Sequence, residues 1–95
     1  MTRKFLVVHG LVQNVGYRHF VWRTAQMCNI KGFVKNADDG SVQVLADGSD
    51  KDMAWFMDEI DIDIKDGAQV FKIDEDNEQL KKYAGKAYQD FKIES

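Results

Sequence analysis

The sequence predicts an α+β fold, a ferredoxin-like βαββαβ sandwich in which one antiparallel sheet carries two helices on one face. Three observations predict this fold. Two segments place apolar residues at helical spacing, short β-like runs flank each of them, and a hairpin signal lies between them. The 95 residues contain no proline, no internal repeat and no linker-like stretch, so we expect residues 1–95 to form a single domain.

The first part of the chain predicts a strand, a loop and an amphipathic helix. The apolar run inside Lys4–His9 predicts a buried strand that ends at Gly10. A helix over 17–28 is expected because apolar residues recur there at helical intervals. These residues are Tyr17, Val21, Ala25 and Cys28. Asn29 suits the end of the helix, because asparagine tolerates a left-handed backbone better than most other residues.

A hairpin and a second helix follow. The segments Gly32–Asn36 and Ser41–Ala46 have β character, and the Asp-Gly pair in the connecting Ala37–Gly40 is a tight-turn signal. Ser49 begins the second helix, since its spacing from Asp52 is that of a capping box. The apolar face of this helix is formed by Met53, Phe56, Met57 and Ile60.

The last part of the chain predicts two further strands, one of them a possible short extra strand. Ala68–Ile73 has strand character, and Ala87–Ile93 alternates apolar and polar residues at its end. Between them, Asp74–Gly85 is charged and aperiodic, which predicts a long exposed loop.

Composition excludes several classes of function. Thirteen Lys and Arg against 16 Asp and Glu leave a net charge of −3, which argues against a protein that tracks nucleic-acid phosphates. No stretch is apolar over the roughly 20 residues that a membrane span needs. The single cysteine, Cys28, cannot form an intrachain disulfide, which favours the cytoplasm, and with only two histidines it forms no zinc-ligand set. We therefore expect no metal and no cofactor.

The most informative segment is the loop between the first strand and the first helix. Gly10 and Gly16 free its backbone, and it ends where unpaired helix N–H groups point outward. Arg18, in the first helical turn, can place its guanidinium over the same point. A phosphate fits such a site, although the same pattern also describes a tight turn beside a solvated arginine.

Two stretches of the sequence resemble the signatures of the acylphosphatase family. Residues 10–18, G-L-V-Q-N-V-G-Y-R, are similar to the first signature, G-x-V-Q-G-V-x-[FY]-R. Gly32–Asn36, followed by Gly40, Val42 and Gly48, matches the second signature throughout. The resemblance covers nearly the whole chain and is weakest over Ile62–Gly85. It departs at Asn14, where the family usually has glycine, and asparagine is the non-glycine residue that best tolerates positive φ.

This resemblance implies hydrolysis of acyl phosphates to a carboxylate and inorganic phosphate. It implies that Arg18 grips the phosphate and that Asn36 orients the attacking water. The backbone amides that complete the pocket would be those of Gln13, Asn14, Val15, Gly16, Tyr17 and Arg18. The expected partner is a small acyl phosphate, with phosphate or sulfate as a product-like ligand, and we expect a monomer that binds neither nucleic acid nor membrane.

Two other functions remain open at this point. One is an acylphosphatase-like domain weakened by Asn14 that only binds anions. The other is an RNA-binding module, because Lys31–Lys35 partly resembles the RNA-recognition core K-G-F-G/A-F-V. That second resemblance lacks the later aromatic residue and is interrupted by Asn36.

Several chemically suggestive residues predict structural roles instead. His19 should point about 100° away from Arg18 on the helix. His9 is expected to make a structural hydrogen bond, and Cys28 to pack in the core. We interpret an acidic cluster as a solvated helix end and not as a metal site. This cluster is Asp58, Glu59, Asp61 and Asp63.

Overall fold

The structure is a computed structural model and describes residues 1–94. These residues form five strands and three helices in the order β1-α1-β2-β3-α2-β4-α3-β5. The strands are β1 (Thr2–Leu11), β2 (Lys31–Asn36), β3 (Val42–Gly48), β4 (Gln69–Glu75) and β5 (Phe91–Glu94). The helices are α1 (Tyr17–Met27), α2 (Asp50–Ile60) and α3 (Asn77–Lys81). The predicted α+β class and the order of its main elements are confirmed.

The sheet is mixed, and not wholly antiparallel as the sequence suggested. Its strand order is β4-β1-β3-β2-β5. The pairs β1·β3, β1·β4 and β2·β3 are antiparallel, whereas β5 pairs with β2 in parallel. The fifth strand is the cause, because the chain leaves β4 at one edge and crosses the sheet before it adds β5 at the other.

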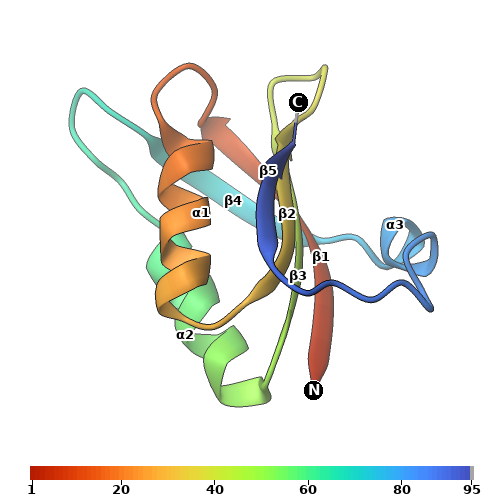
Figure 1. Cartoon of the computed structure of the whole chain (residues 1–95). Coiled ribbons are helices and arrows are strands. Elements are labelled where there is room, and N and C mark those ends of the chain that lie inside the picture. The colour runs from red at the N-terminus through yellow and green to blue at the C-terminus, as the bar shows by residue number, and fades with distance from the viewer. Residues whose placement is uncertain (95) are drawn as a thin grey trace.

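The two long helices lie side by side on one face of the sheet, and α3 lies on the opposite side (Figure 1). The larger part of the core fills the space beneath α1 and α2, with Val21, Val44 and Phe56 fully buried. Tyr17 ties the two helices together, because its hydroxyl donates a 2.8 Å hydrogen bond to the carbonyl of Ile60. Burial raises the pKa of the Tyr17 hydroxyl, so it stays a proton donor.

The helix boundaries follow the local signals closely. Ser49 caps α2 by accepting a 3.1 Å bond from the Asp52 amide, as the capping-box spacing predicts. The first helix ends at Met27, one residue before the expected Cys28, and Asn29 adopts the expected left-handed backbone with φ of 57°.

The expectation of a long exposed loop over Asp74–Gly85 is wrong. The strand β4 continues to Glu75, and α3 follows, capped by Asp76, which accepts a 3.0 Å bond from the Gln79 amide. A five-residue helix is too short to produce a periodic pattern, so the sequence gives no helical signal there. The last strand is also shorter than expected, Phe91–Glu94 in place of Ala87–Ile93.

This crossing segment, residues 76–90, covers the second face of the sheet. Tyr83 packs against Phe5 and Phe33, with ring centroids 5.7 and 5.3 Å apart. Arg3 fastens the segment, because its guanidinium donates to the Tyr83 carbonyl at 2.9 Å and pairs with the Asp47 carboxylate at 3.0 Å. The part of the second face around Phe5 and Phe33 is therefore covered.

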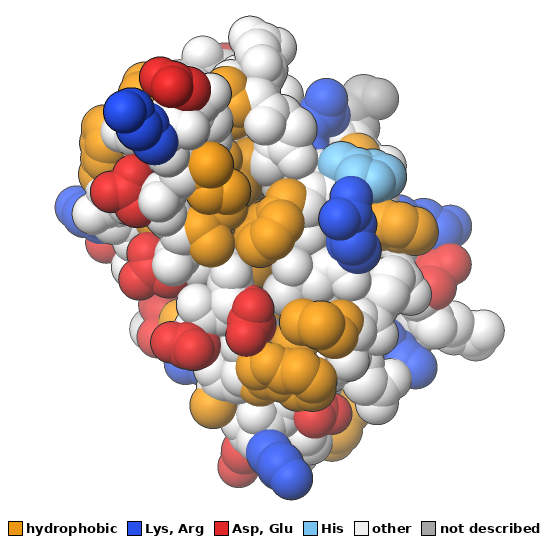
Figure 2. Space-filling model, turned by 90° about the vertical axis from the view of Figure 1, so that its left-hand side faces the viewer, with side chains coloured by type: hydrophobic (Ala, Val, Ile, Leu, Met, Phe, Trp, Pro, Cys, Tyr) orange, Lys and Arg blue, Asp and Glu red, His pale blue; other side chains and the backbone are white. Residues whose placement is uncertain are grey.

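The surface over the helices is mixed in character. Figure 2 looks onto this side, where hydrophobic side chains stand in separate groups among charged ones. Within residues 1–94, no helix is both long enough and apolar enough to cross a membrane.

Candidate anion site at the start of the first helix

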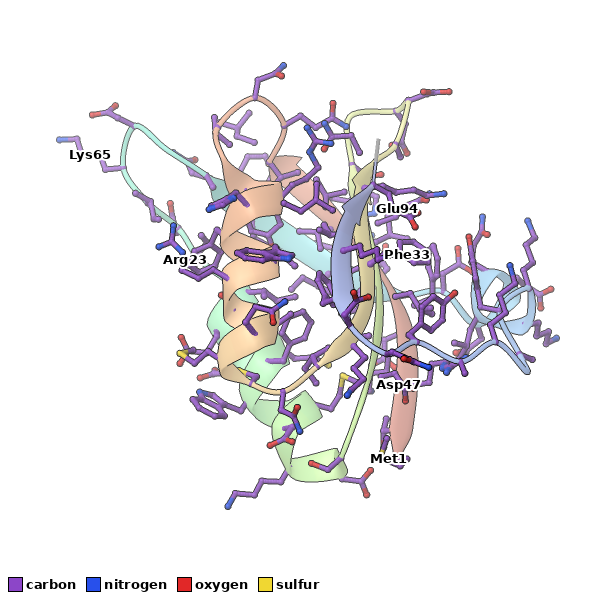
Figure 3. The ribbon with its side chains drawn as sticks, viewed as in Figure 1. Met1, Arg23, Phe33, Asp47, Lys65 and Glu94 are labelled. Carbon is purple, nitrogen blue, oxygen red and sulfur yellow. The ribbon has the colours of Figure 1, made fainter. Side chains whose placement is uncertain are left out.

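The residues singled out in the sequence come from several elements that meet at one end of the sheet. The end of β1 lies beside the start of β3, since Val8 pairs with Val42, and Asn36 at the end of β2 pairs with the same Val42. The end of β5 is placed there by the pairing of Lys35 with Glu94. Figure 3 labels Glu94 at that end of β5, level with the loop that leads into α1.

The loop between β1 and α1 is shaped by two left-handed residues. Asn14 has φ of 63° and Gly16 has φ of 79°, so both positions require a conformation that most residues avoid. Asn14 thus occupies a position that needs positive φ, which asparagine tolerates better than other non-glycine residues. Val12 is buried and anchors the start of the loop, whereas Asn14, Val15 and Gly16 are exposed. Left-handed residues alternating with other conformations turn successive N–H groups toward one concave surface, which suits an anion.

The N-terminus of α1 is open. Phe20 is the first helical donor, bonded to the Gly16 carbonyl at 3.1 Å, so the amides of Tyr17 and Arg18 have no partner inside the helix. Within the described chain, the cap residue Gly16 contributes no side-chain bond and the first turn holds no acidic residue. The partial positive charge of this helix end is therefore not offset by an acidic side chain of the first turn.

Arg18 lies half-buried in the first turn of α1. Its Nη1 donates to the carbonyl of Glu94 at 3.2 Å, which holds the guanidinium beside the end of β5. A guanidinium has five N–H donors, so this single bond leaves most of its capacity for an anion.

Asn36 provides the second unusual feature of the site. Its Oδ1 atom is buried and has no hydrogen-bond partner among residues 1–94. An unpaired buried acceptor costs about 1–3 kcal/mol, so such atoms are rare in native structures and call for an explanation. An O–H donor, such as a bound water, would satisfy this oxygen.

Gln13 links the loop to the hairpin that carries Asn36. Its Nε2 donates to the carbonyls of Ala37 and Ser41, each at 2.8 Å. The sequence points only to the backbone amide of Gln13 and not to these contacts of its side chain. The one available signal was the presence of glutamine in the first family signature.

The hairpin turn itself is closed by a polar network. Asp39 accepts from the Ser41 amide at 2.9 Å and from the Ser41 hydroxyl at 2.6 Å. These bonds lower the pKa of the Asp39 carboxyl, because they stabilise its ionised form.

A surface depression of about 550 Å³ adjoins the loop on the side of β1 and β4. Leu11 and Val15 line part of it, and both are substantially exposed, at 54% and 42%. Arg18 and Asn36 are not among its lining residues. The loop therefore presents an apolar surface next to its polar one.

The other suggestive residues lie outside this arrangement. His9 pairs with Asp74 on the neighbouring strand at 3.3 Å, and His19 is exposed beside the Trp22 ring. Cys28 is buried, and burial raises the pKa of its thiol. Over residues 1–94, no group of three or more His, Cys, Asp or Glu side chains is placed to hold a metal ion, and the acidic run around Asp61 is no exception.

Comparisons with known proteins agree with one another. A sequence model described as acylphosphatase matches residues 4–93. An acylphosphatase of Pasteurella multocida is 52% identical over 54 residues, which is 57% of this chain and 60% of that protein. For the first three curated relatives the aligned part covers 60 to 64% of the relative's own length. The crystal structure of an acylphosphatase from Bacillus subtilis superposes with a TM-score of 0.80 at 30% identity, with all of both chains covered. The crystal structure of HypF from T. kodakarensis superposes with a TM-score of 0.76 at 26% identity over 99% of this chain and 12% of that one.

Proposed function

This chain belongs to the acylphosphatase family, and from that premise we propose that it is an acylphosphatase that hydrolyses acyl phosphates to a carboxylate and inorganic phosphate. The observation that carries the proposal is the unpaired, buried Oδ1 of Asn36 at the same end of the sheet as Arg18 and the open start of α1. For a water molecule to attack a phosphoryl group, a hydrogen-bond acceptor that holds the water must lie close to the site that binds the phosphate.

The phosphoryl group would lie in the concave side of the loop. The amides of residues 13–18 and the guanidinium of Arg18 would bind its oxygens, because both are donors fixed before the substrate arrives. The charge that develops on these oxygens in the transition state is stabilised by the same donors, so binding and rate depend on one set of groups.

Asn36 would hold the attacking water. If the water donates one hydrogen to Oδ1, its lone pair is directed away from the asparagine and toward the phosphorus. The water oxygen then forms the new P–O bond while the bond from phosphorus to the acyl oxygen breaks in line, and the electron pair leaves with the carboxylate.

The leaving group needs no proton from the protein. A carboxylate has a conjugate acid with a pKa of about 4, so it departs as an anion at neutral pH. The amide of Asn36 is too weak a base to take the water proton, and we infer that a phosphoryl oxygen accepts it. An ionisation near neutral pH that persisted across substrates and belonged to a protein group would contradict this inference.

The acyl part of the substrate would extend out of the anion site. The apolar surface of Leu11 and Val15 beside the loop supports contact with an acyl chain or ring. Benzoyl phosphate is therefore a suitable test substrate.

The RNA-binding alternative is disfavoured by the covered second face. Ferredoxin-like RNA readers stack bases on aromatic side chains of the open sheet face. Here the outward-facing rings of Phe5 and Phe33 are buried beneath Tyr83 and Tyr88. The anion-binding alternative depends on Asn14, whose left-handed backbone matches the conformation that glycine would adopt there.

The domain organisation, oligomeric state, cellular location and metal requirement of the protein are also part of the proposal. We propose that residues 1–95 act as one domain, that the protein works as a monomer in the cytoplasm, and that it needs no metal. The buried free thiol of Cys28 supports the reducing compartment.

The test is release of phosphate from benzoyl phosphate with EDTA present. The protein should turn over the substrate, and Arg18→Ala should lower kcat/KM by about 10²-fold or more, in line with the loss of a transition-state donor. Far-UV circular dichroism should show the variant folded. An inactive protein that Asn14→Gly revives would instead indicate an anion-binding domain that has lost its activity.

A further inference from the structure

We infer that the Gln13 side chain is a positioning residue that holds Asn36 in place relative to the anion loop. This inference rests on the proposed acylphosphatase activity, because it concerns the relative placement of the phosphate and the water. It assigns to the side chain of Gln13 a role separate from that of its backbone amide.

The contacts of Gln13 are specific. Its side chain is partly buried, and its Nε2 donates to the carbonyls of Ala37 and Ser41, each at 2.8 Å. A side-chain amide nitrogen has two hydrogens, so both are engaged with the hairpin. The side chain of Gln13 therefore has no donor left for the phosphate, and it acts through the hairpin.

The two carbonyls lie on the two sides of the turn that follows Asn36. Ala37 is the next residue after Asn36, and its amide donates to the Ser41 carbonyl at 2.9 Å. Asp39 closes the turn through its bonds to Ser41. These bonds lie within the hairpin. The side-chain amide of Gln13, by contrast, connects the hairpin to the loop that would bind the phosphate.

The reaction is sensitive to this connection. The water on Asn36 must lie in line with the breaking P–O bond, and a displacement of about 1 Å can cost on the order of 10²-fold in rate. Asn36 pairs with Val42 of β3, and within residues 1–94 the paired positions of β2 with β5 end one residue earlier, at Lys35. The side-chain amide of Gln13 supplies a further restraint on Asn36, from the loop that would bind the phosphate.

A double-mutant cycle between Gln13 and Asn36 tests this inference. Gln13→Met keeps the length of the side chain and removes both donors. With benzoyl phosphate we expect Gln13→Met to lower kcat by about tenfold or more. Inhibition by inorganic phosphate should change by less than about threefold, because the loop amides and Arg18 remain. In an Asn36→Ala background, the same Gln13→Met change should lower kcat by less than about threefold, because the water is no longer held.

Three results would overturn the inference. An equal loss of kcat in both backgrounds would indicate a general structural role. A loss of phosphate inhibition in step with kcat would mean that Gln13 shapes the anion loop itself. An unchanged kcat would mean that the two hydrogen bonds have no role in positioning.

The controls separate this inference from the proposed function. Gln26→Met changes an exposed glutamine of α1 and should leave kcat unchanged. If Gln13→Met does not fold, Gln13→Asn keeps the amide but shortens its reach, and it should show the same dependence on Asn36. A wild-type protein without activity would contradict the proposed function, whereas an active protein with additive losses would contradict only the role of Gln13.

Discussion

The starts of α1 and α2 differ, although both helices have 11 residues. At α2, Ser49 accepts a bond from the Asp52 amide, and Asp50 and Asp52 place negative charge in the first turn. At α1, Gly16 has a left-handed backbone and, within residues 1–94, neither a side-chain cap nor an acidic residue in the first turn satisfies the helix end. One helix end is satisfied by the protein itself, and the other is left for a ligand. The proposed anion site therefore belongs to the uncapped start of α1, whereas the capped start of α2 contributes to stability.

The largest expected effect comes from replacing the guanidinium of Arg18 at the uncapped start of α1. Arg18→Lys keeps a positive charge but replaces a planar fork with a single ammonium. We expect kcat with benzoyl phosphate to fall by about 10²-fold, with the fold unchanged. A lysine variant with a near-normal rate would show that charge alone suffices and would refute the role given to Arg18.

Removing the cap at the start of α2 should lower stability and leave the rate of hydrolysis unchanged. Ser49→Ala removes the cap of α2, which typically costs about 1 kcal/mol. For a domain of this size that corresponds to a fall in Tm of about 4–8 °C. Thermal unfolding and the benzoyl phosphate assay should be measured on the same sample. A loss of kcat at a temperature where the variant is fully folded would contradict the separation between the two helix ends.

The smallest expected effect concerns Asp39, in the hairpin beside the start of α1, whose contribution to stability depends on pH. The bonds from Ser41 lower the pKa of Asp39 in the folded state, so ionised Asp39 contributes stability above its unfolded pKa of about 3.9. That contribution is lost as the pH falls through the lower folded value. Asp39→Asn should therefore shift the urea midpoint slightly downward at neutral pH and by less at about pH 3. An equal shift at both pH values would mean that the charge of Asp39 does not matter.

The sequence predicted the elements that have strong local signals. The capping box at Ser49, the Asp-Gly turn of the hairpin and the left-handed Asn29 all appear where expected, because each depends on a few adjacent residues. Asn14 stands where the family signature has glycine, and its positive φ agrees with that place.

The features that were missed depend on contacts between distant residues. The direction of β5 follows from its pairing with β2, about which its own four residues carry no information. The cover formed by Tyr83 over Phe33 depends on a short helix in a charged segment. Likewise, the bonds from Gln13 to the hairpin and the unpaired oxygen of Asn36 arise only when the loop and the hairpin are brought together.

The bond between Arg18 and the Glu94 carbonyl joins the first helix to the last strand. The guanidinium can be held there only after β5 has docked against β2, which requires contacts between residues far apart in the chain. A partly folded molecule with its first helix formed would still lack this restraint on Arg18. The role proposed for Arg18 therefore requires the final strand to be in place.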